Sequence, residues 1–518
     1  MNIKNILFTS LFVSGVALSA HSQSVGNGLI FSQETNGGTA RFKGLGNAKT
    51  ALGGDISSIT GNPAGLGFFG QSDISVTFNY NNATNKGTYF GNSISKNKGR
   101  FGVDHAGAVF HFPKNEGYYG WQNFNVGISY ENTNRFSNHV RYEGVNPNNT
   151  IVSAYTDDIA AFGDNSLANS LYGMKLIERF ANTDNSYFPI TNESGNKDQI
   201  SDILTTGNSF KTSLAFGGNY NNVFYIGGNI GFSSFIHENS AQFSEYGWTK
   251  DVATVGHDDY NPNSNFIDPT HPNYAFLDKN YEMLDDYYQR SEGTGIDFKI
   301  GAMYKPTVDW NIGATITSPT WYTIDQYTES YIGVDYYDNE NAENAFDYGE
   351  TEFTDDFTYS LITPWKFGLG VSKFFSRGLV SADAEYVNYG SIKVRSAGQV
   401  NSSDNALWDE DFKNAYKGVV NLRLGGEYLI TNTISGRAGI NYFGNPYKNA
   451  DNKQYSGSLG LGTKLTNTLY LDLAVVHLIN DYKVSPYVID EEFWGSTSPV
   501  ADIKHQRTNV VLTLGAKF

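Results

Sequence analysis

Short stretches of alternating apolar and polar residues run along most of the chain. In one of them, Val420, Leu422 and Leu424 alternate with Asn421 and Arg423. Successive side chains of a β-strand point to opposite faces, so this pattern predicts strands with one apolar and one polar face. About fourteen such segments lie near 73–82, 101–112, 121–135, 206–220, 222–245, 293–306, 309–327, 363–375, 378–394, 415–430, 433–443, 454–465, 468–482 and 506–518.

The connections between these segments alternate in length. Several neighbouring pairs are joined by only a few residues, whereas the links at 136–205, 246–292, 328–362 and 483–505 are long and polar. An even number of strands with short turns at one end and long loops at the other is typical of outer-membrane barrels. The pattern therefore predicts an all-β fold: a transmembrane antiparallel β-barrel of about 14 strands, with its long extracellular loops, over residues 73–518.

Both ends of the chain carry export and assembly signals. Lys4, an apolar run at 6–18 and small residues after it predict a signal peptide at 1–22. After this run no stretch approaches the eighteen or so apolar residues of a membrane-spanning helix. The last segment, "VVLTLGAKF", alternates up to the terminal aromatic Phe518. We interpret Phe518 as part of the signal that the barrel assembly machinery reads.

Composition narrows the choice of class and partners. Apolar residues make up 39% of the chain, while it contains 55 Gly, 35 Tyr and 35 Phe, which suits sheets better than a helical core. The net charge of −17 argues against nucleic acid as a partner, because a phosphate backbone attracts positive charge. The chain has no Cys, and hence no disulfide. We expect a monomer in contact with outer-membrane lipids.

One segment before the barrel fits neither strand nor helix. The run "ALGGDISSITGNPAGLGFF" at 51–69 is rich in glycine, which weakens helices, and its Pro63 lacks a backbone donor. The stretch Gly61, Asn62, Pro63, Ala64 and Gly65 has the chemistry of a tight turn, which by itself indicates no more than a surface loop. Residues 23–72 have no place in a lipid-facing wall. They either hang in the periplasm or fold back into the lumen.

The same region resembles a known family. The run "ARFKGLGNAKTALGGDISSITGNPAGLGFF" at 40–69 is similar to the N-terminal hatch of the FadL-type outer-membrane transporters of long-chain fatty acids and other hydrophobic compounds, and Asn62-Pro63-Ala64 matches their triplet. Further resemblance lies at 301–319, 363–372, 381–389, 422–446 and 459–477. The resemblance implies a hatch at 23–72, entering the barrel from the periplasmic side, in the outer membrane of a Gram-negative bacterium. The long, acidic loops depart from the hydrophobic loops of the fatty-acid members.

Charged residues on the polar faces are expected to line the lumen. Six of them alternate with apolar positions, which predicts pairing across the lumen rather than general acid–base catalysis: Asp383, Glu385, Arg423, Glu427, Arg437 and Asp472. In the loop at 164–180, Leu167, Leu171, Met174 and Ile177 recur at helical spacing, with Asn165 or Ser166 able to cap the helix. This helix either collects ligand or packs on the barrel rim.

The sequence lacks complete motifs for binding a dinucleotide, calcium or a catalytic metal. The stretch 44–54 departs from a dinucleotide loop at Lys49, the acidic stretch 259–270 lacks the Gly and Glu of a calcium loop, and the histidines are scattered. We therefore expect no metal, no cofactor and no enzyme activity. The expected function is passive uptake of a hydrophobic small molecule, first of all long-chain fatty acids, by rearrangement of the hatch. The alternatives are a transporter of aromatic hydrocarbons or another lipophilic ligand, a surface-binding, adhesin-like or structural barrel, and a barrel enzyme such as a lipase.

Overall fold

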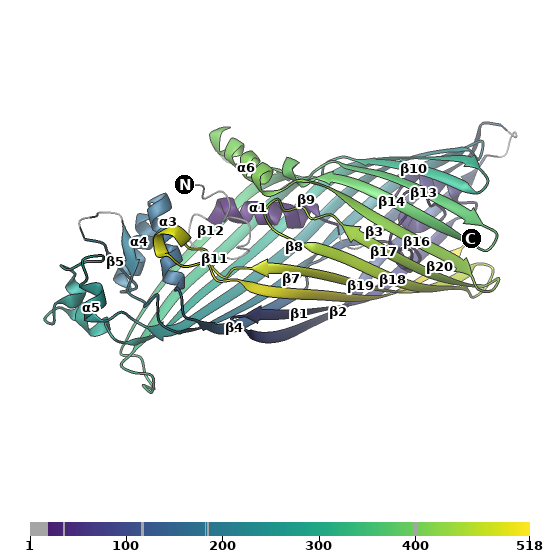
Figure 1. The fold of residues 1–518 in the computed structure, drawn as a ribbon. Helices are drawn as coiled ribbons and strands as arrows, with labels where there is room; N and C mark the ends of the chain where they lie inside the picture. The colour runs from purple at the N-terminus through teal and green to yellow at the C-terminus, as the bar shows by residue number, and fades with distance from the viewer. Residues whose placement is uncertain (1–18, 35–36, 115–118, 182, 184–185, 397–401) are drawn as a thin grey trace.

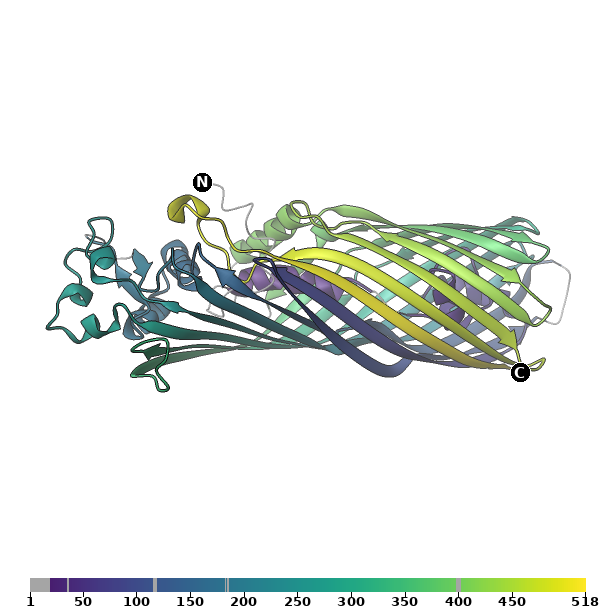
Figure 2. The ribbon, with the colours of Figure 1, turned by 60° about the horizontal axis from the view of Figure 1, so that its bottom comes forward.

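The chain forms a closed antiparallel β-barrel of fourteen strands, seen from two sides in Figures 1 and 2. The computed structural model describes residues 19–34, 37–114, 119–181, 183, 186–396 and 402–518. The predicted signal peptide at 1–22 lies almost wholly outside these residues, so it stays a prediction. No helix among the described residues is long and apolar enough to cross a bilayer.

Ten barrel strands are continuous, and four are broken into two pieces. In chain order the strands are β1 (Asp73–Tyr89), β2 (Asn92–Pro113), β3 with β4 (Trp121–Arg135, Asn138–Asn146), β7 (Lys197–Tyr220), β8 (Phe224–Trp248), β9 (Asn280–Thr307), β10 with β11 (Trp310–Thr317, Trp321–Tyr337), β12 with β13 (Asp347–Ile362, Lys366–Phe375), β14 with β15 (Gly378–Asn388, Lys393–Ser396), β16 (Gly418–Leu429), β17 (Ile434–Phe443), β18 (Lys453–Lys464), β19 (Leu469–Val484) and β20 (Ala501–Lys517).

The seam between the first and last strands closes the barrel. β20 pairs with β1 from Asp73 opposite Lys517 to Thr88 opposite Asp502. The terminal residue extends this ladder, because the Phe518 N–H donates to the Ser72 carbonyl (3.0 Å) and the Ser72 N–H donates to the Phe518 carbonyl (3.1 Å). The Phe518 side chain is 67% exposed. The final aromatic thus lies at the outer edge of the seam.

The prediction of about fourteen strands is confirmed, and each predicted segment coincides with one barrel strand. The polar links between the strands are shorter than the sequence predicts, because the strands extend into them. The stretch 280–292 belongs to β9, and 328–337 and 347–362 belong to β11 and β12. In these parts exposed polar residues stand on the face that is apolar elsewhere, as in "DYGETEFTDDF" of β12. Strand alternation is lost where both faces of a strand meet water, so the sequence pattern missed these extensions.

The two faces of the wall differ as a membrane requires. Leu422 and Leu424 on the outer face of β16 are 49% and 45% exposed. Asn421, the residue just before Leu422, faces inward and is only 7% exposed. The outer face continues around the barrel with exposed apolar side chains: Phe216, Ile226, Ile300, Ile312, Leu369, Leu459, Leu461, Leu473 and Leu512. A continuous apolar outer belt around a polar interior is the surface of an outer-membrane barrel.

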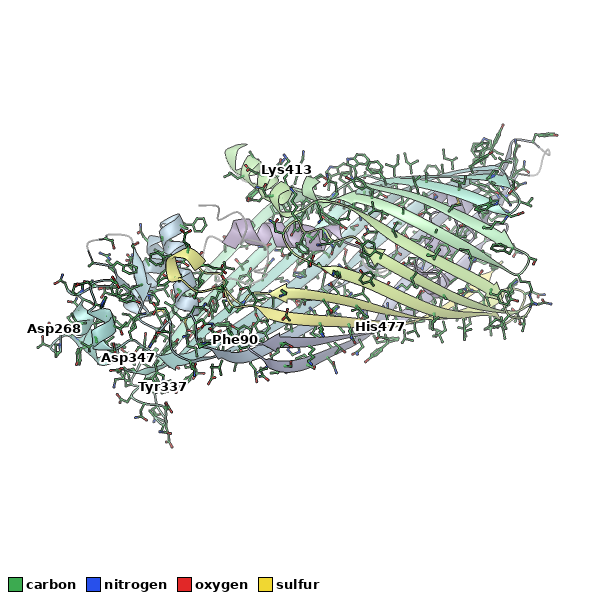
Figure 3. The ribbon with its side chains drawn as sticks, viewed as in Figure 1. Phe90, Asp268, Tyr337, Asp347, Lys413 and His477 are labelled. Atoms are coloured by element: carbon green, nitrogen blue, oxygen red, sulfur yellow. The ribbon has the colours of Figure 1, made fainter. Side chains whose placement is uncertain are left out.

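The end with the long loops carries a separate apolar core, which has more members than any other apolar cluster of the described residues. It contains α3 (Ile151–Phe162), α4 (Asn165–Gly173), β5 (Ile177–Arg179), β6 (Tyr187–Pro189), α5 (Val252–Val255), η4 (Asn265–Ile267), η5 (Pro272–Phe276) and α7 (Glu491–Trp494). Figure 3 places Asp268, Tyr337 and Asp347 at this loop end, far from the short turns and the C-terminus. Farther along the barrel, η6 (Tyr389–Ser391) lies between β14 and β15, and α6 (Ser402–Ala415) lies in the link from β15 to β16.

The segment that precedes β1 runs inside the barrel, as the purple ribbon of Figures 1 and 2 shows. It contains α1 (Ser19–Ser32), α2 (Ala40–Gly44), η2 (Ile56–Ser58) and η3 (Pro63–Phe68). From Ala40 to Phe69 almost all of its side chains are buried. α2 contacts β17 to β20, while η3 contacts β3, β7, β8 and β9. This part of the chain therefore touches opposite sides of the wall near the end that carries the short turns.

Candidate functional site

The predicted turn at Asn62 fixes the inner segment to itself and to the wall. The Asn62 side chain caps η3, because its Oδ1 accepts the Ala64 N–H at 3.1 Å, and Pro63 fills the first position, where no N–H is needed. Its Nδ2 donates to the Thr50 carbonyl at 2.7 Å and lies 3.3 Å from the Ala302 carbonyl of β9. The motif Gly61 to Gly65 thus forms a buried anchor point instead of a surface loop.

A row of glycines in the wall makes room for this turn. Gly217, Gly227 and Gly301 are direct neighbours across β7, β8 and β9. A side-chain carbon at Gly301 would overlap Asn62 Oδ1, and one at Gly217 or Gly227 would overlap Pro63. The repeated "GGN" at 217–219 and 227–229 was the available sequence signal. Its meaning depends on a register between strands that the sequence analysis did not derive.

We expect Gly301→Val to force the Asn62 turn away from the wall. Overpacking of this kind lowers the free energy of unfolding by about 1–3 kcal/mol, and it should also make the segment 40–69 cleavable by trypsin at Arg41, Lys43 or Lys49. The matched control is Gly457→Val, because a side-chain carbon at Gly457 on β18 meets nothing within 4 Å. Limited proteolysis and urea unfolding in detergent compare the two. Equal behaviour of both variants would contradict the packing described here.

Inward-facing side chains of the wall satisfy the irregular backbone of the inner segment. The Thr50 N–H donates to Asp383 Oδ2 at 2.7 Å and the Ala40 N–H donates to Thr513 Oγ1 at 2.8 Å. Three wall amides donate to carbonyls: Asn125 to Leu66 (2.6 Å), Asn229 to Ile59 (3.0 Å) and Asn311 to Ala51 (3.2 Å). Buried backbone groups need hydrogen-bond partners, and here polar side chains on the inner face of the barrel take the place of water.

The predicted lumen charges pair between nearby strands of the stretch β14 to β19, and not across the lumen as expected, because the side chains on one face of adjacent strands are the nearest partners. Arg437 donates to two carboxylates: its Nε to Glu427 Oε2 at 2.6 Å and its Nη1 to Asp472 Oδ1 at 2.5 Å. Arg41 of the inner segment also donates to Glu427, through two bonds of 3.1 and 3.2 Å. Arg423 pairs with Glu385 at 2.9 Å. Asp383 accepts the Thr50 N–H. Arg41 could not be found from the sequence pattern, because its partner Glu427 lies 386 positions away.

The loop residues that were considered for ligand collection are all buried. Leu167, Leu171, Met174 and Ile177 belong to the core of the loop end. The helix there is shorter than expected: α4 ends at Gly173, and Ile177 lies in β5. Asp164 caps it, accepting from Ser166 N and Leu167 N, in place of the predicted Asn165 or Ser166. Packing at the rim of the barrel therefore accounts for these four side chains.

α1 packs into a buried apolar cluster, called here the apolar chamber, which lies between residues 40–69 of the inner segment and the loop end and is filled by side chains of α1 itself. Leu29 and Phe31 are buried there, and the Phe31 ring stacks on Phe235 of β8 with centroids 4.2 Å apart. Phe412 of α6 lies against Gly28. The same cluster contains Phe136, Tyr322, Ile324, Tyr359, Leu361, Val387 and Tyr389. Aromatic side chains from the wall thus surround a short apolar stretch of the N-terminal helix.

A polar cavity of about 860 Å³ adjoins this chamber. Val387 and Tyr389 belong to the apolar cluster and also line the cavity. Glu34, which follows α1, lies at the cavity surface. Basic side chains predominate among its charged lining residues: Lys49, Lys299, Lys366, Lys417, Arg423, Lys448, Lys483 and Arg507 stand against Glu34, Glu131, Asp383, Glu385 and Asp451. The lining of this cavity therefore has an excess of positive charge, although the protein as a whole has a net charge of −17.

The described part of the chain contains no cluster of side chains suited to binding a metal ion. No group of three or more His, Asp or Glu side chains there is placed to hold a metal ion. In the acidic stretch 257–268, Asp268 accepts the Thr270 N–H at 2.9 Å and so caps a turn.

Solved structures with the same architecture define the fold class. A Pseudomonas aeruginosa FadL homologue superimposes with a TM-score of 0.52 at 14% identity, covering 94% of this chain and 100% of its own. The toluene transporter TodX of Pseudomonas putida does so with a TM-score of 0.52 at 12% identity, covering 94% of this chain and 99% of its own. The chain matches no known family model and no curated protein sequence. The fold is that of the FadL-type outer-membrane barrels, as the resemblance predicted.

Proposed function

We propose that this protein is a passive transporter of the Gram-negative outer membrane that takes up hydrophobic compounds, first of all long-chain fatty acids, past a hatch formed by residues 23–72. The observation that carries the proposal is the apolar chamber next to a positively charged cavity inside the barrel. A fatty acid has a long apolar chain and one carboxylate. The apolar surroundings of Phe235 and Tyr322 suit the chain once α1 has moved out of them, and the lysines of the adjoining cavity suit the carboxylate.

A neutral aromatic hydrocarbon is the second candidate. The rings of Phe31, Phe136 and Phe235 form an aromatic wall that such a compound could contact edge or face on. The compound has no group that would use the neighbouring lysines, so the fatty acid accounts for more of the interior. For a surface-binding barrel, the filled interior would have no purpose. The closed interior also makes an energy-independent pathway depend on movement of the hatch.

Uptake by cells tests the proposal. A host strain that lacks its own fatty-acid transporter would carry either this protein or an empty vector, and the uptake of radiolabelled palmitate and of toluene would be measured. We expect palmitate uptake to rise well above the empty vector, by about tenfold or more, without added energy sources. Uptake of toluene alone would favour the second candidate. No uptake of either compound, with the barrel present in the outer membrane, would contradict transport of both classes.

A further inference from the structure

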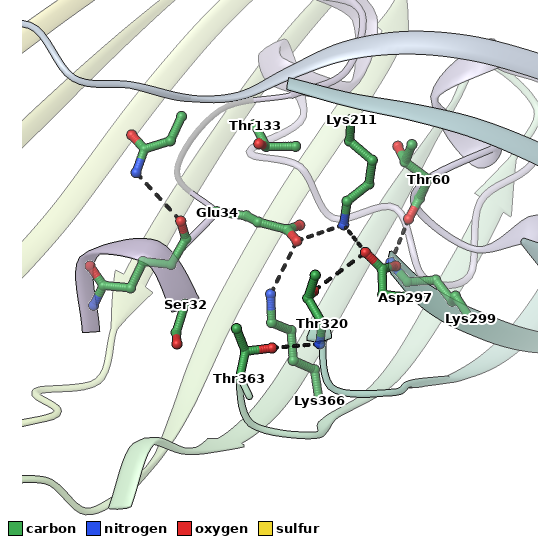
Figure 4. A network of polar contacts seen from close by, with 12 residues as sticks. Ser32, Glu34, Thr60, Thr133, Lys211, Asp297, Lys299, Thr320, Thr363 and Lys366 are labelled. Carbon is green, nitrogen blue, oxygen red and sulfur yellow. Dashed lines mark hydrogen bonds and ion pairs between the residues drawn. The ribbon is translucent and has the colours of Figure 1, made fainter. Parts of the chain in front are cut away.

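Three lysines of the wall meet one carboxylate of the N-terminal segment. Glu34 Oε1 lies 2.8 Å from Lys211 Nζ on β7 and 3.3 Å from Lys366 Nζ on β13, and Figure 4 shows both contacts. Lys299 on β9 lies close by, and its Nζ donates to the Thr60 carbonyl. Three strands of one continuous stretch of the wall, β7-β8-β9-β10-β13, thus direct ammonium groups toward one acidic side chain.

Two wall carboxylates, Asp297 and Glu385, lie near these lysines, and each already has a basic partner in the wall. Asp297, which is buried, pairs with Lys211 at 3.0 Å and accepts from Thr320 at 3.4 Å. Glu385 attracts Lys366 and Lys299 but pairs with Arg423 at 2.9 Å. The three ammonium groups and Arg423 therefore face two carboxylates of the wall and one of the N-terminal segment. Burial acts to raise the pKa of the Glu34 carboxyl, but the attraction of Lys211, Lys366 and Lys299 outweighs it and holds the pKa well below its ordinary value. Glu34 is therefore ionised.

Glu34 can be replaced from the cavity. Its side chain remains 37% exposed, and it lines the polar cavity together with Lys299 and Lys366. Three positions earlier, Phe31 lies in the apolar chamber. The N-terminal segment thus presents an apolar group and a carboxylate to two adjoining parts of the interior. An amphiphile with a carboxylate head would present the same two groups to the same places.

We propose that Lys211, Lys299 and Lys366 form a carboxylate-binding site for an anionic amphiphile, and that Glu34 occupies this site as an internal competitor until the ligand displaces it. The identity of the ligand rests on the proposed function, but the competition rests on the contacts of Glu34. Because Glu34 is tethered, it competes at a high effective concentration. Displacing it removes two ion pairs that hold the end of α1, which couples ligand binding to release of the N-terminal segment.

Binding of a matched pair of probes tests this site. The full-length protein in nanodiscs would be titrated with laurate and with dodecanol, which share a chain and differ in the carboxylate. Glu34→Gln should tighten laurate binding by about tenfold, because the competing charge is gone, and should change dodecanol binding less than twofold. In the Glu34→Gln background, Lys366→Gln should weaken laurate binding by about tenfold and leave dodecanol unchanged.

Glu131→Gln is the matched control. Glu131 lines the same cavity and makes no ion pair among the described residues. Its substitution removes the same charge from the cavity, so a general electrostatic effect would raise laurate affinity in both variants. Selective tightening in Glu34→Gln alone supports the site at the three lysines. An equal gain in both variants would overturn it.

Movement of α1 gives a second, independent measurement. A side-chain carbon at Gly26 meets nothing within 4 Å, so Gly26→Cys can carry a spin label without crowding. Laurate should increase the mobility of this label in the protein with Glu34, while dodecanol should not. If laurate binds but neither the label nor the Glu34→Gln affinity responds, Glu34 is no competitor and transport still stands. If no variant binds laurate or dodecanol, the proposed function falls together with this site.

Discussion

Leu424→Arg should lower the free energy of unfolding by about 2–4 kcal/mol, because it places a charge against hydrocarbon. Leu424 is 45% exposed on the outer face of β16, where it lies opposite Ala382 of β14 and Ile440 of β17. Unfolding in urea, followed by tryptophan fluorescence in lipid vesicles, gives the measurement. The variant should still insert, at lower yield.

Asn421→Ser, on the inner face of the same strand, is the comparison. Asn421 Nδ2 lies 3.3 Å from Glu385 Oε1, and its Oδ1 accepts the Gly444 N–H at 3.1 Å. The sequence alone predicts a nearly neutral change. The structure adds the loss of these two bonds, of which the serine hydroxyl and lumen water can replace one, so the expected net cost is about 0.5–1.5 kcal/mol. The cost should therefore stay below that of Leu424→Arg, and equal costs at the two positions would reject the assignment of the faces.

Deletion of Phe518, or Phe518→Asp, should prevent most of the protein from reaching the outer membrane. The terminal aromatic belongs to the alternating outer face of β20, and its backbone completes the ladder to Ser72 at the seam. Membrane fractionation, with heat-modifiable migration on gels as the measure of the closed barrel, shows the result. We expect at least a tenfold loss. Phe518→Tyr, which keeps the aromatic end, is the control.

A variant without Phe518 that reaches the outer membrane in normal amount, as a closed barrel, would show that the assembly signal lies elsewhere. The Tyr variant separates the aromatic requirement from the backbone ladder. Loss of assembly in Phe518→Tyr as well would point to the exact ring surface of Phe.

The barrel could be predicted from the sequence because lipid and lumen impose opposite polarity on alternate residues. Leu422 and Leu424 against Asn421 are enough to define a strand with two faces. The same rule fails beyond the membrane, where strands such as β12 have water on both sides. The loop-end core followed a helical pattern only in part, since α4 ends at Gly173 and the chain continues as β5.

Of the residues inside the barrel, only those in a local sequence motif could be predicted. Asn62 and Pro63 stood out as a turn, and the structure shows what the turn contacts. Arg41, Gly301 and Glu34 did not stand out, because each acquires its role from a residue more than a hundred positions away: Glu427, Asn62 and Lys211 respectively. Such contacts depend on the closure and register of the barrel, which periodicity alone does not determine.

Tethering the inner segment to the wall tests directly whether it must move for passage. The Ala40 N–H donates to Thr513 Oγ1 at 2.8 Å, so the two residues are in direct contact and the pair Ala40→Cys and Thr513→Cys is the one to cross-link, in a chain with no other Cys. Palmitate uptake would be followed in the oxidised and the reduced protein, with each single Cys variant as control. The account predicts that uptake is lost on oxidation and returns with reductant. A fully cross-linked barrel that transports palmitate at the rate of the reduced protein would contradict it.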